Sequence, residues 1–289
     1  MQHLYHILAI VTSAIWGTTF ISSKLLLDNG LSPAAIMALR FAIAYIFMLP
    51  FVKGKWWCQN IKDEFLMVVL GIMGGSAYFL LENTALLYTQ ASNVAIIIAA
   101  TPLLTMFTVN IMNKGKGADR KLYLYSMLSL AGVALVVFNG NFILKLNPIG
   151  DLLTLGAALT WAVYSIVLNK VEGRYPLMMI TRKIFFYGVL TLLPYCLYEG
   201  WGVTGSMLMR PVVWGNLLFL GIIASLVCYV TWNMVINKLG TIEATNYLYI
   251  NPIVAMLASY IFLEEKITWL AIVGATLILA GVYFAQRKR

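Results

Sequence analysis

Charged residues are scarce in this chain. Asp, Glu, Lys and Arg make up 11% of its 289 residues, against about 25% in an average soluble domain. Long polar stretches are also missing, because ten apolar runs of about 20 residues, the length that crosses a bilayer, occupy nearly the whole sequence. The sequence therefore predicts an integral membrane protein with no room for a water-soluble domain.

Residues for metal, redox or acid–base chemistry are equally few. The only two histidines, His3 and His6, lie at the N-terminus, so histidine chemistry inside a span is excluded. The three cysteines, Cys58, Cys196 and Cys228, have neither metal-binding nor redox spacing, and nothing resembles a Walker A loop. These absences argue against a membrane-embedded enzyme and against direct ATP hydrolysis, and they predict no cofactor and no metal.

The net charge of +9 raises the question of a nucleic-acid partner, which the placement of the charge excludes. With the N-terminus inside, thirteen lysines and arginines fall in inside loops, and four lie outside or at a helix end, namely Lys24, Lys145, Arg210 and Lys266. This is the asymmetry of the positive-inside rule. It predicts a multi-pass protein of the cell inner (plasma) membrane with both termini in the cytoplasm.

The two halves of the chain resemble each other. Trp16 corresponds to Trp161, and the tetrad Leu-Ala-Gly-Val occurs twice, 149 residues apart. Each half, residues 1–140 and 146–289, holds five apolar runs, and an odd number forces the second copy to enter the membrane upside down. The predicted fold is an all-α membrane protein of ten transmembrane helices arranged as two inverted five-helix repeats, an architecture of many secondary transporters.

Turn-forming clusters and proline starts set the expected helix limits. In the first half the expected helices are 4–27, 33–52, 65–88, 91–112 and 122–138, and in the second half they are 147–168, 177–197, 212–236, 243–263 and 267–285.

The stretch from Glu82 to Pro102 has an echo 150 residues later that ends at Pro252. In both copies a polar turn follows one apolar helix, and a proline falls within the next. Each proline removes a backbone donor and frees a carbonyl four residues earlier. The pattern predicts helix breaks at these prolines, which either face a central cavity or simply kink the helices.

Trp16 and Trp161 fall near the middle of their spans, whereas tryptophan usually prefers the membrane interface. Their rings are expected either to line a cavity or to pack between helices. Polar and aromatic side chains in other spans must meet one another, water or a ligand. The predicted cavity residues are Trp16, Thr19, Tyr78, Glu82, Asn83, Thr101, Trp161, Tyr164, Tyr229, Trp232, Asn233, Tyr247 and Asn251.

Glu82 is the one acid well inside a span, and Arg40 falls at a similar depth. An ionisable group in a span is a functional hypothesis by default. The two residues are predicted to form a gate, as a pair or through a charged substrate. The alternative is that Arg40 extends outward and Glu82 reaches interfacial water.

The chain resembles the EamA-like ten-helix branch of the drug/metabolite transporter superfamily. The resemblance lies in AIWGTTFISSK at residues 14–24, in ENTALLYTQASNVAIIIAATP at residues 82–102, in the two Leu-Ala-Gly-Val tetrads, and in Asn251-Pro252 followed by FLEE at residues 262–265. The first half departs from the family pattern, because Asn113-Lys114 stands where a Glu usually follows the fourth helix. Any role of that acid is therefore left to Glu264 or Glu265.

The resemblance implies a central cavity between the halves and the transport, often export, of small metabolites such as amino acids. The expected function is thus a secondary transporter working by alternating access, with a small metabolite and membrane lipids as partners and a proton as a candidate coupling ion. The alternative is a lipid or amphiphilic-drug transporter with a cavity open to the bilayer. Both a monomer and a homodimer remain open.

Overall fold

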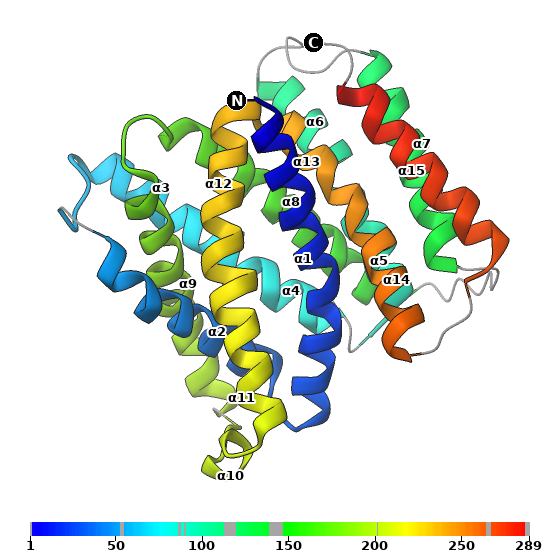
Figure 1. Ribbon diagram of the computed structural model, residues 1–289. Helices are drawn as coiled ribbons and strands as arrows, with labels where there is room; N and C mark the ends of the chain where they lie inside the picture. The colour runs from blue at the N-terminus through cyan, green and yellow to red at the C-terminus, as the bar shows by residue number, and fades with distance from the viewer. Residues whose placement is uncertain are drawn as a thin grey trace.

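The computed structural model describes residues 2–52, 55–85, 88–89, 91–112, 120–138, 147–200, 202–263 and 267–286, and within these ranges the chain is helical with no strand (Figure 1). Eight helical segments of the described residues are long and apolar enough to cross a membrane by length and composition. Two further segments, residues 91–112 and 241–263, are each interrupted before a proline. Together they match the ten predicted spans.

The first half contains five helical segments. They are α1 (Gln2–Asp28), α2 (Pro33–Met48) with the short 3-10 turn η1 (Leu49–Phe51), the continuous unit of α3 (Ile61–Gly71), η2 (Ile72–Ser76) and α4 (Ala77–Ala85), the interrupted pair α5 (Ala91–Ala99) and α6 (Thr101–Met112), and α7 (Arg120–Phe138).

The second half repeats this order. It contains α8 (Pro148–Val171), α9 (Leu177–Glu199), the unit of α11 (Pro211–Leu218), η3 (Phe219–Val227) and α12 (Cys228–Leu239), the interrupted unit of α13 (Thr241–Asn246), η4 (Tyr247–Ile250) and α14 (Asn251–Leu263), and α15 (Trp269–Gln286). A short helix, α10 (Gly205–Leu208), lies in the connection before α11.

Helix starts follow the sequence signals. The Ser32 hydroxyl accepts the backbone N–H of Ala35 at 3.2 Å, and a proline follows at the first helical position of α2. The amide oxygen of Asn147 likewise accepts the N–H groups of Ile149 and Gly150 at the start of α8. Side chains thus satisfy donors that a helix end leaves open.

Both predicted breaks coincide with a local interruption of the helix. In the first half α5 ends at Ala99, and α6 begins two residues later, with Pro102 as its second residue. The carbonyl of Ile98 accepts the Thr101 hydroxyl at 2.5 Å. In the second half four residues of 3-10 helix precede Asn251, whose N–H bonds the Leu248 carbonyl. The carbonyls that the prolines free are therefore satisfied within their own segments.

The third helix of each half contains a π-helical stretch. Gly71 directly precedes η2, and Gly221, which lies 150 residues later, is part of η3. A π-helix adds a residue per turn, weakens the hydrogen-bond ladder and occurs often at functional sites. The two halves thus have the same irregularity at the same place.

Contacts between α7 and α15 show the two-fold relation of the halves. A Cβ on Gly132 would meet the N atom of Ile278 at 2.8 Å, and a Cβ on Gly281 would meet the hydroxyl of Ser129. Each contact is the image of the other, because Ile278 is the equivalent of Ser129 and Gly281 is the equivalent of Gly132, both 149 residues further along the chain. Ser129 also contacts its own equivalent, Ile278, through a 3.4 Å bond to its carbonyl. Reciprocal contacts of this kind define a two-fold interface.

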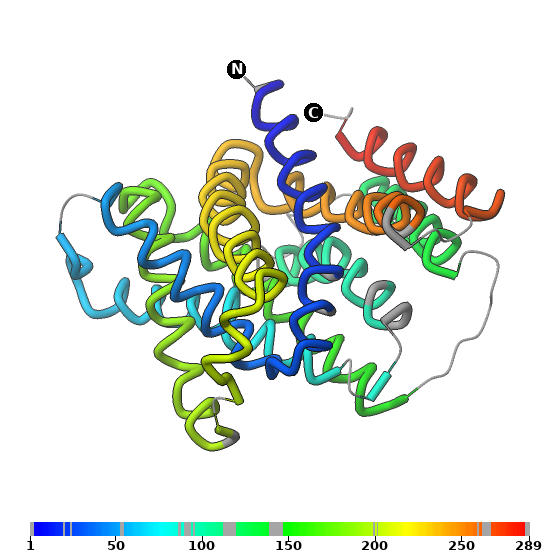
Figure 2. The backbone as a smooth tube through the Cα atoms, turned by 60° about the horizontal axis from the view of Figure 1, so that its bottom comes forward, coloured from blue at the N-terminus to red at the C-terminus, as the bar shows by residue number. Residues whose placement is uncertain are grey.

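The start of α1 and the end of α15 lie at the same end of the bundle, at the top of Figures 1 and 2. The side-chain amide of Gln286, in the last turn of α15, donates to the Glu243 carbonyl in α13 at 3.1 Å, which places the start of α13 there too. We call this the terminal end. Large apolar side chains such as Leu152 and Phe107 are more than half exposed on the outside, as expected for contact with lipid.

Replacing Gly132 by Ala is expected to lower the melting temperature, because the new Cβ would lie 2.5 Å from the backbone oxygen of Gly274 and push α7 away from α15. The matched control is Gly215→Ala, where a Cβ meets nothing within 4 Å and alanine favours the helix by about 1 kcal/mol. Circular dichroism of the detergent-solubilised variants measures both. Equal melting temperatures would contradict the close helix contact.

Candidate functional site

An aromatic cluster fills the centre of the bundle. The ring of Trp16, on α1, lies 5.4 Å from that of Trp161, on α8, and 5.1 Å from that of Trp232, on α12. Trp16 and Trp161 are equivalent residues of the two halves, so their contact lies on the pseudo-two-fold axis. The sequence predicted that these two rings either line a cavity or pack between helices. The structure shows that they contact each other.

Three tyrosines extend the cluster. Tyr78, on α4, lies 5.2 Å from Trp161, and Tyr164, on α8, lies 5.0 Å from it on another side. Tyr229, on α12, lies 6.0 Å from both Trp16 and Trp161. Six of the predicted residues, from four helical segments, therefore form one aromatic cluster.

The three indole N–H groups of the cluster differ in their partners. Trp16 donates to the carbonyl of Ala224, in the π-helical stretch η3, at 2.9 Å. The Nε1 atoms of Trp161 and Trp232 are buried and have no hydrogen-bond partner among the residues that the structure describes. A buried donor without a partner is costly. Two such donors lie beside the ring of Trp16, and they point to a ligand that accepts hydrogen bonds.

Glu82 and Arg40 are both buried, at 6% and 4% exposure, so the predicted alternative of extension to the interface is wrong. No ion pair joins them within the described ranges. Glu82 instead accepts the Tyr78 hydroxyl at 3.1 Å. Arg40 donates from Nε to the Ser225 hydroxyl at 2.9 Å and lies over the ring of Phe79 at 4.6 Å. The two residues thus have separate partners.

Three of the predicted polar residues bond other helices. The Tyr164 hydroxyl donates to Oδ1 of Asn233 at 2.7 Å, and the amide of Asn233 donates to the Thr181 hydroxyl at 2.9 Å, which links α8, α12 and α9. Tyr229 donates to the carbonyl of Gly74, in the π-helical stretch η2, at 2.5 Å. The π-helical stretches of both halves therefore accept hydrogen bonds from the cluster.

Other predicted residues lie away from the cluster or bond locally. Thr19 donates to the Trp16 carbonyl at 2.7 Å. Tyr247 bonds the ring nitrogen Nδ1 of His6 at 2.6 Å, towards the terminal end. Asn251 packs against Gly17 of α1 through its backbone, and its side-chain oxygen has no partner in the described part of the chain. Asn83 is half-buried on α4.

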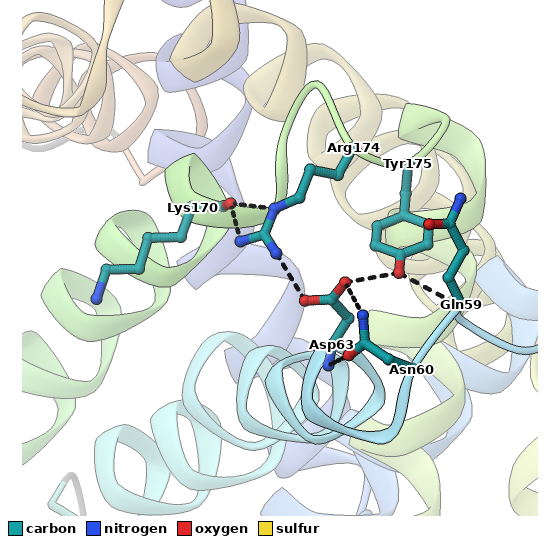
Figure 3. A network of polar contacts seen from close by, with 6 residues as sticks. All are labelled: Gln59, Asn60, Asp63, Lys170, Arg174 and Tyr175. Atoms are coloured by element: carbon teal, nitrogen blue, oxygen red, sulfur yellow. Dashed lines mark hydrogen bonds and ion pairs between the residues drawn. The ribbon is translucent and has the colours of Figure 1, made fainter.

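Figure 3 shows a polar network between the halves at the start of α3. Asp63 accepts Nη1 of Arg174 at 2.7 Å and the Tyr175 hydroxyl at 2.7 Å, both from the segment that connects α8 and α9. Asn60 donates to the same carboxylate at 3.0 Å, and the backbone N–H of Gln59 donates to the Tyr175 hydroxyl at 3.1 Å. The network ties the first half to the second.

A second ion pair lies beside it. Lys183, fully buried on α9, pairs with Glu64 on α3, which also accepts the Tyr187 hydroxyl. Lys183 is the equivalent of Arg40, so each of these cations reaches the third helix of the other half. Sequence reasoning did not predict this pair, although a lysine inside an apolar span signals a buried acid partner. Glu264 and Glu265 lie outside the described residues.

Ten helical segments with two-fold contacts surround an aromatic centre that holds unpartnered donors. A family model for the EamA-like transporter family matches residues 3–138 and again residues 148–286, so the chain belongs to that family, which is one of transporters and not of enzymes. The family has the ten-helix repeat architecture predicted from the sequence.

Relatives cover almost the full chain. An uncharacterized transporter of Archaeoglobus fulgidus is 28% identical over 100% of this chain and 99% of its own. A probable terminal-alkyne amino-acid exporter of Streptantibioticus cattleyicolor is 23% identical over 96% of this chain and 92% of its own. A solved crystal structure, 17% identical, shares the fold with a TM-score of 0.78 over 99% of this chain and 96% of that chain.

The partners of the indole groups predict different effects of Trp→Phe changes at equivalent sites. Trp16→Phe removes a made hydrogen bond, so stability should fall by about 1 kcal/mol. Trp161→Phe removes the same volume and a donor without a protein partner, so the melting temperature should change less. Thermal unfolding without added solute compares the two. A larger loss for Trp161→Phe would show that its N–H has a structural role.

Proposed function

We propose that this transporter exports a small organic metabolite that carries both an amine and a carboxylate, such as an amino acid, by alternating access. Membership of the EamA-like family supports the transport role. The Streptantibioticus relative, a probable terminal-alkyne amino-acid exporter, supports the substrate class.

The observation that carries the proposal is the pairing of opposite chemistries in the cluster. The unpartnered indole N–H groups of Trp161 and Trp232 are donors for a carboxylate. Glu82 is held beside the cluster by Tyr78, whose ring contacts Trp161, and it is an acceptor for an ammonium group. Aromatic faces attract the same ammonium through cation–π interaction, by about 0.5–2 kcal/mol. A zwitterion complements both sets.

Alternating access follows from the two-fold architecture. If one half rocks against the other, the contact of Trp16 with Trp161 on the axis must change, so substrate can displace one ring from the other. The interrupted segments at Ala100 and at 247–250 provide places where a helix bends without breaking a full ladder of hydrogen bonds. We place the terminal end on the cytoplasmic side of the inner membrane because the basic loops gather on that side.

Liposomes containing the purified protein test the proposal by counterflow with a panel of labelled amino acids. Exchange of an internal unlabelled amino acid for the labelled one supports it. Labelled amphiphilic cations and a fluorescent phospholipid serve as the second arm, because a bilayer-open transporter would move these and leave the amino acids behind. Exchange in the second arm alone would replace the proposed substrate class.

Glu82→Gln is expected to weaken amino-acid counterflow while the protein still folds. Loss of a hydrogen bond to a charged group costs about 1.5–3 kcal/mol, or about 10- to 100-fold in affinity. The matched control is Asp28→Asn, an exposed acid at the end of α1, which should leave counterflow unchanged. Wild-type exchange by the Glu82 variant would remove this residue from the site.

Trp161→Phe and Trp232→Phe should each raise the concentration of amino acid needed for half-maximal counterflow. The amine analogues of the same amino acids, which lack the carboxylate, should be affected much less, because they have nothing for the indole N–H groups to bond. Equal effects on an amino acid and its amine analogue would contradict the role of the indoles in carboxylate binding.

A further inference from the structure

Glu172 follows the last residue of α8 and caps that helix at the terminal end. Both of its carboxylate oxygens are buried and without a hydrogen-bond partner among the described residues. Its backbone N–H bonds the Leu168 carbonyl at 3.0 Å, which fixes the residue on the helix end. The carbonyl end of a helix is the negative end of its dipole and disfavours a second negative charge.

The nearest cations along the chain are directed elsewhere. Arg174 is engaged by Asp63 and by the Lys170 carbonyl (Figure 3). The Lys170 side chain is exposed. The other titratable groups near this end, on the elements packed against α8 and in the segment after it, are Lys62, Asp63 and Glu64 of α3, Tyr164 of α8 itself, Tyr175, Lys238 of α12 and Glu243 of α13. No ion pair of the described ranges includes Glu172.

Burial raises the pKa of Glu172 to about 8. The side-chain amide of Asn237 lies near the carboxylate and lowers the pKa, although it makes no hydrogen bond of full geometry to either oxygen. The carboxyl group is therefore protonated for part of the time near neutral pH. A small change in its surroundings, such as the arrival of a cation or of water, is enough to change its charge.

A row of polar groups leads from this carboxyl to the aromatic cluster. Asn237 and Asn233 lie one turn apart on α12 and therefore share a face of that helix. Asn233 accepts the Tyr164 hydroxyl at 2.7 Å, and the Tyr164 ring lies 5.0 Å from Trp161. Movement of α8 against α12 on substrate binding would thus change the environment of Glu172.

We infer that Glu172 is a proton-binding site whose loading from water at the terminal end is linked to the movement of substrate. The ligand is a single proton, which adds to a carboxylate oxygen and leaves it again as the site is exposed to water. The link to substrate rests on the proposed function, but proton binding itself does not. Glu172 follows α8 at the terminal end, whereas Glu82 lies on α4 and accepts the Tyr78 hydroxyl, so the two acids are separate sites.

Infrared difference spectroscopy of the solubilised protein without any substrate tests proton binding directly. Wild-type protein should show a protonated carboxyl band that disappears between about pH 6 and about pH 9.5, around the raised value, and that is absent from Glu172→Gln. Asn237→Leu should shift the midpoint upward, because it removes the amide that favours the charged form. Other buried acids, such as Glu82, are present in both proteins, so only the difference between wild type and Glu172→Gln is assigned to Glu172. The absence of a carboxyl band from that difference would overturn the inference.

Counterflow and gradient-driven uptake test the link to transport, with the amino acid that exchanges best in the panel. Glu172→Gln should retain counterflow but lose the response to an imposed pH gradient, and Glu172→Asp should regain it in part. The control is Asp28→Asn, which should behave as wild type. An unchanged gradient response in Glu172→Gln would overturn the link. If no amino acid exchanges, the proposed function fails while the infrared titration still decides the proton site.

Stability should also depend on pH through this residue. Glu172 has its pKa raised from 4.5 in the unfolded chain to about 8 in the folded protein, so folding takes up a proton between these values. The stability present at low pH is therefore lost as pH rises from about 5 to above 8. The melting temperature of Glu172→Gln should fall less over that range. Parallel melting curves would contradict the raised pKa.

Discussion

The contact of Trp16 with Trp161 is the point around which the rest of the molecule is arranged. These residues are equivalent in the two halves, and their rings meet edge to face at 5.4 Å on the pseudo-axis. Two other pairs of equivalent helices are also in contact, α2 with α9 and α7 with α15. An edge-to-face contact between equivalent rings is not symmetric, because one ring presents its edge and the other presents its face. Trp16 has a bonded N–H, and Trp161 does not.

This asymmetry suits a transporter. Two identical halves would bind a symmetric ligand, whereas an amino acid has a positive and a negative end. The first half contributes the carboxylate of Glu82, and the second half has Trp232 at the equivalent position. The cluster therefore has an acceptor on one side of the axis and free donors on the other. The proposed amino-acid site takes its two different ends from this divergence of the repeats.

The charged residues at the terminal end perform a different task. Asp63 and Glu64, in the first turn of α3, bind Arg174 and Lys183 of the second half. A buried cation is stable only when a partner compensates its lost hydration. These two ion pairs connect the halves at one end of the bundle. Glu172 has no such cation as a partner among the described residues, and burial raises its pKa to about 8.

The amount that could be predicted differed between the fold and the site. Apolar runs, cap residues such as Ser32 and the repeated prolines carried enough local information to predict ten spans and their limits within a few residues. For Trp16 and Trp161 the sequence left open whether the rings line a cavity or pack between helices, and the structure shows the two rings in contact. The partners of Arg40 and Lys183 were not predictable, because residues far apart in the chain supply them.

The sequence by itself determined the membrane location, the duplicated helical pattern and the broken fourth and ninth spans, because length, apolarity and backbone chemistry act locally. Only the tertiary structure decided which polar groups bond each other and which are left free. Thr101 bonds a carbonyl of its own segment, and the backbone of Asn251 packs against Gly17 of α1. The packing of distant segments leaves the indole N–H groups of Trp161 and Trp232 and the carboxylate of Glu172 without a hydrogen-bond partner among the described residues. Hydrogen-bond satisfaction depends on every neighbour in space, and a linear pattern specifies only the neighbours in the chain.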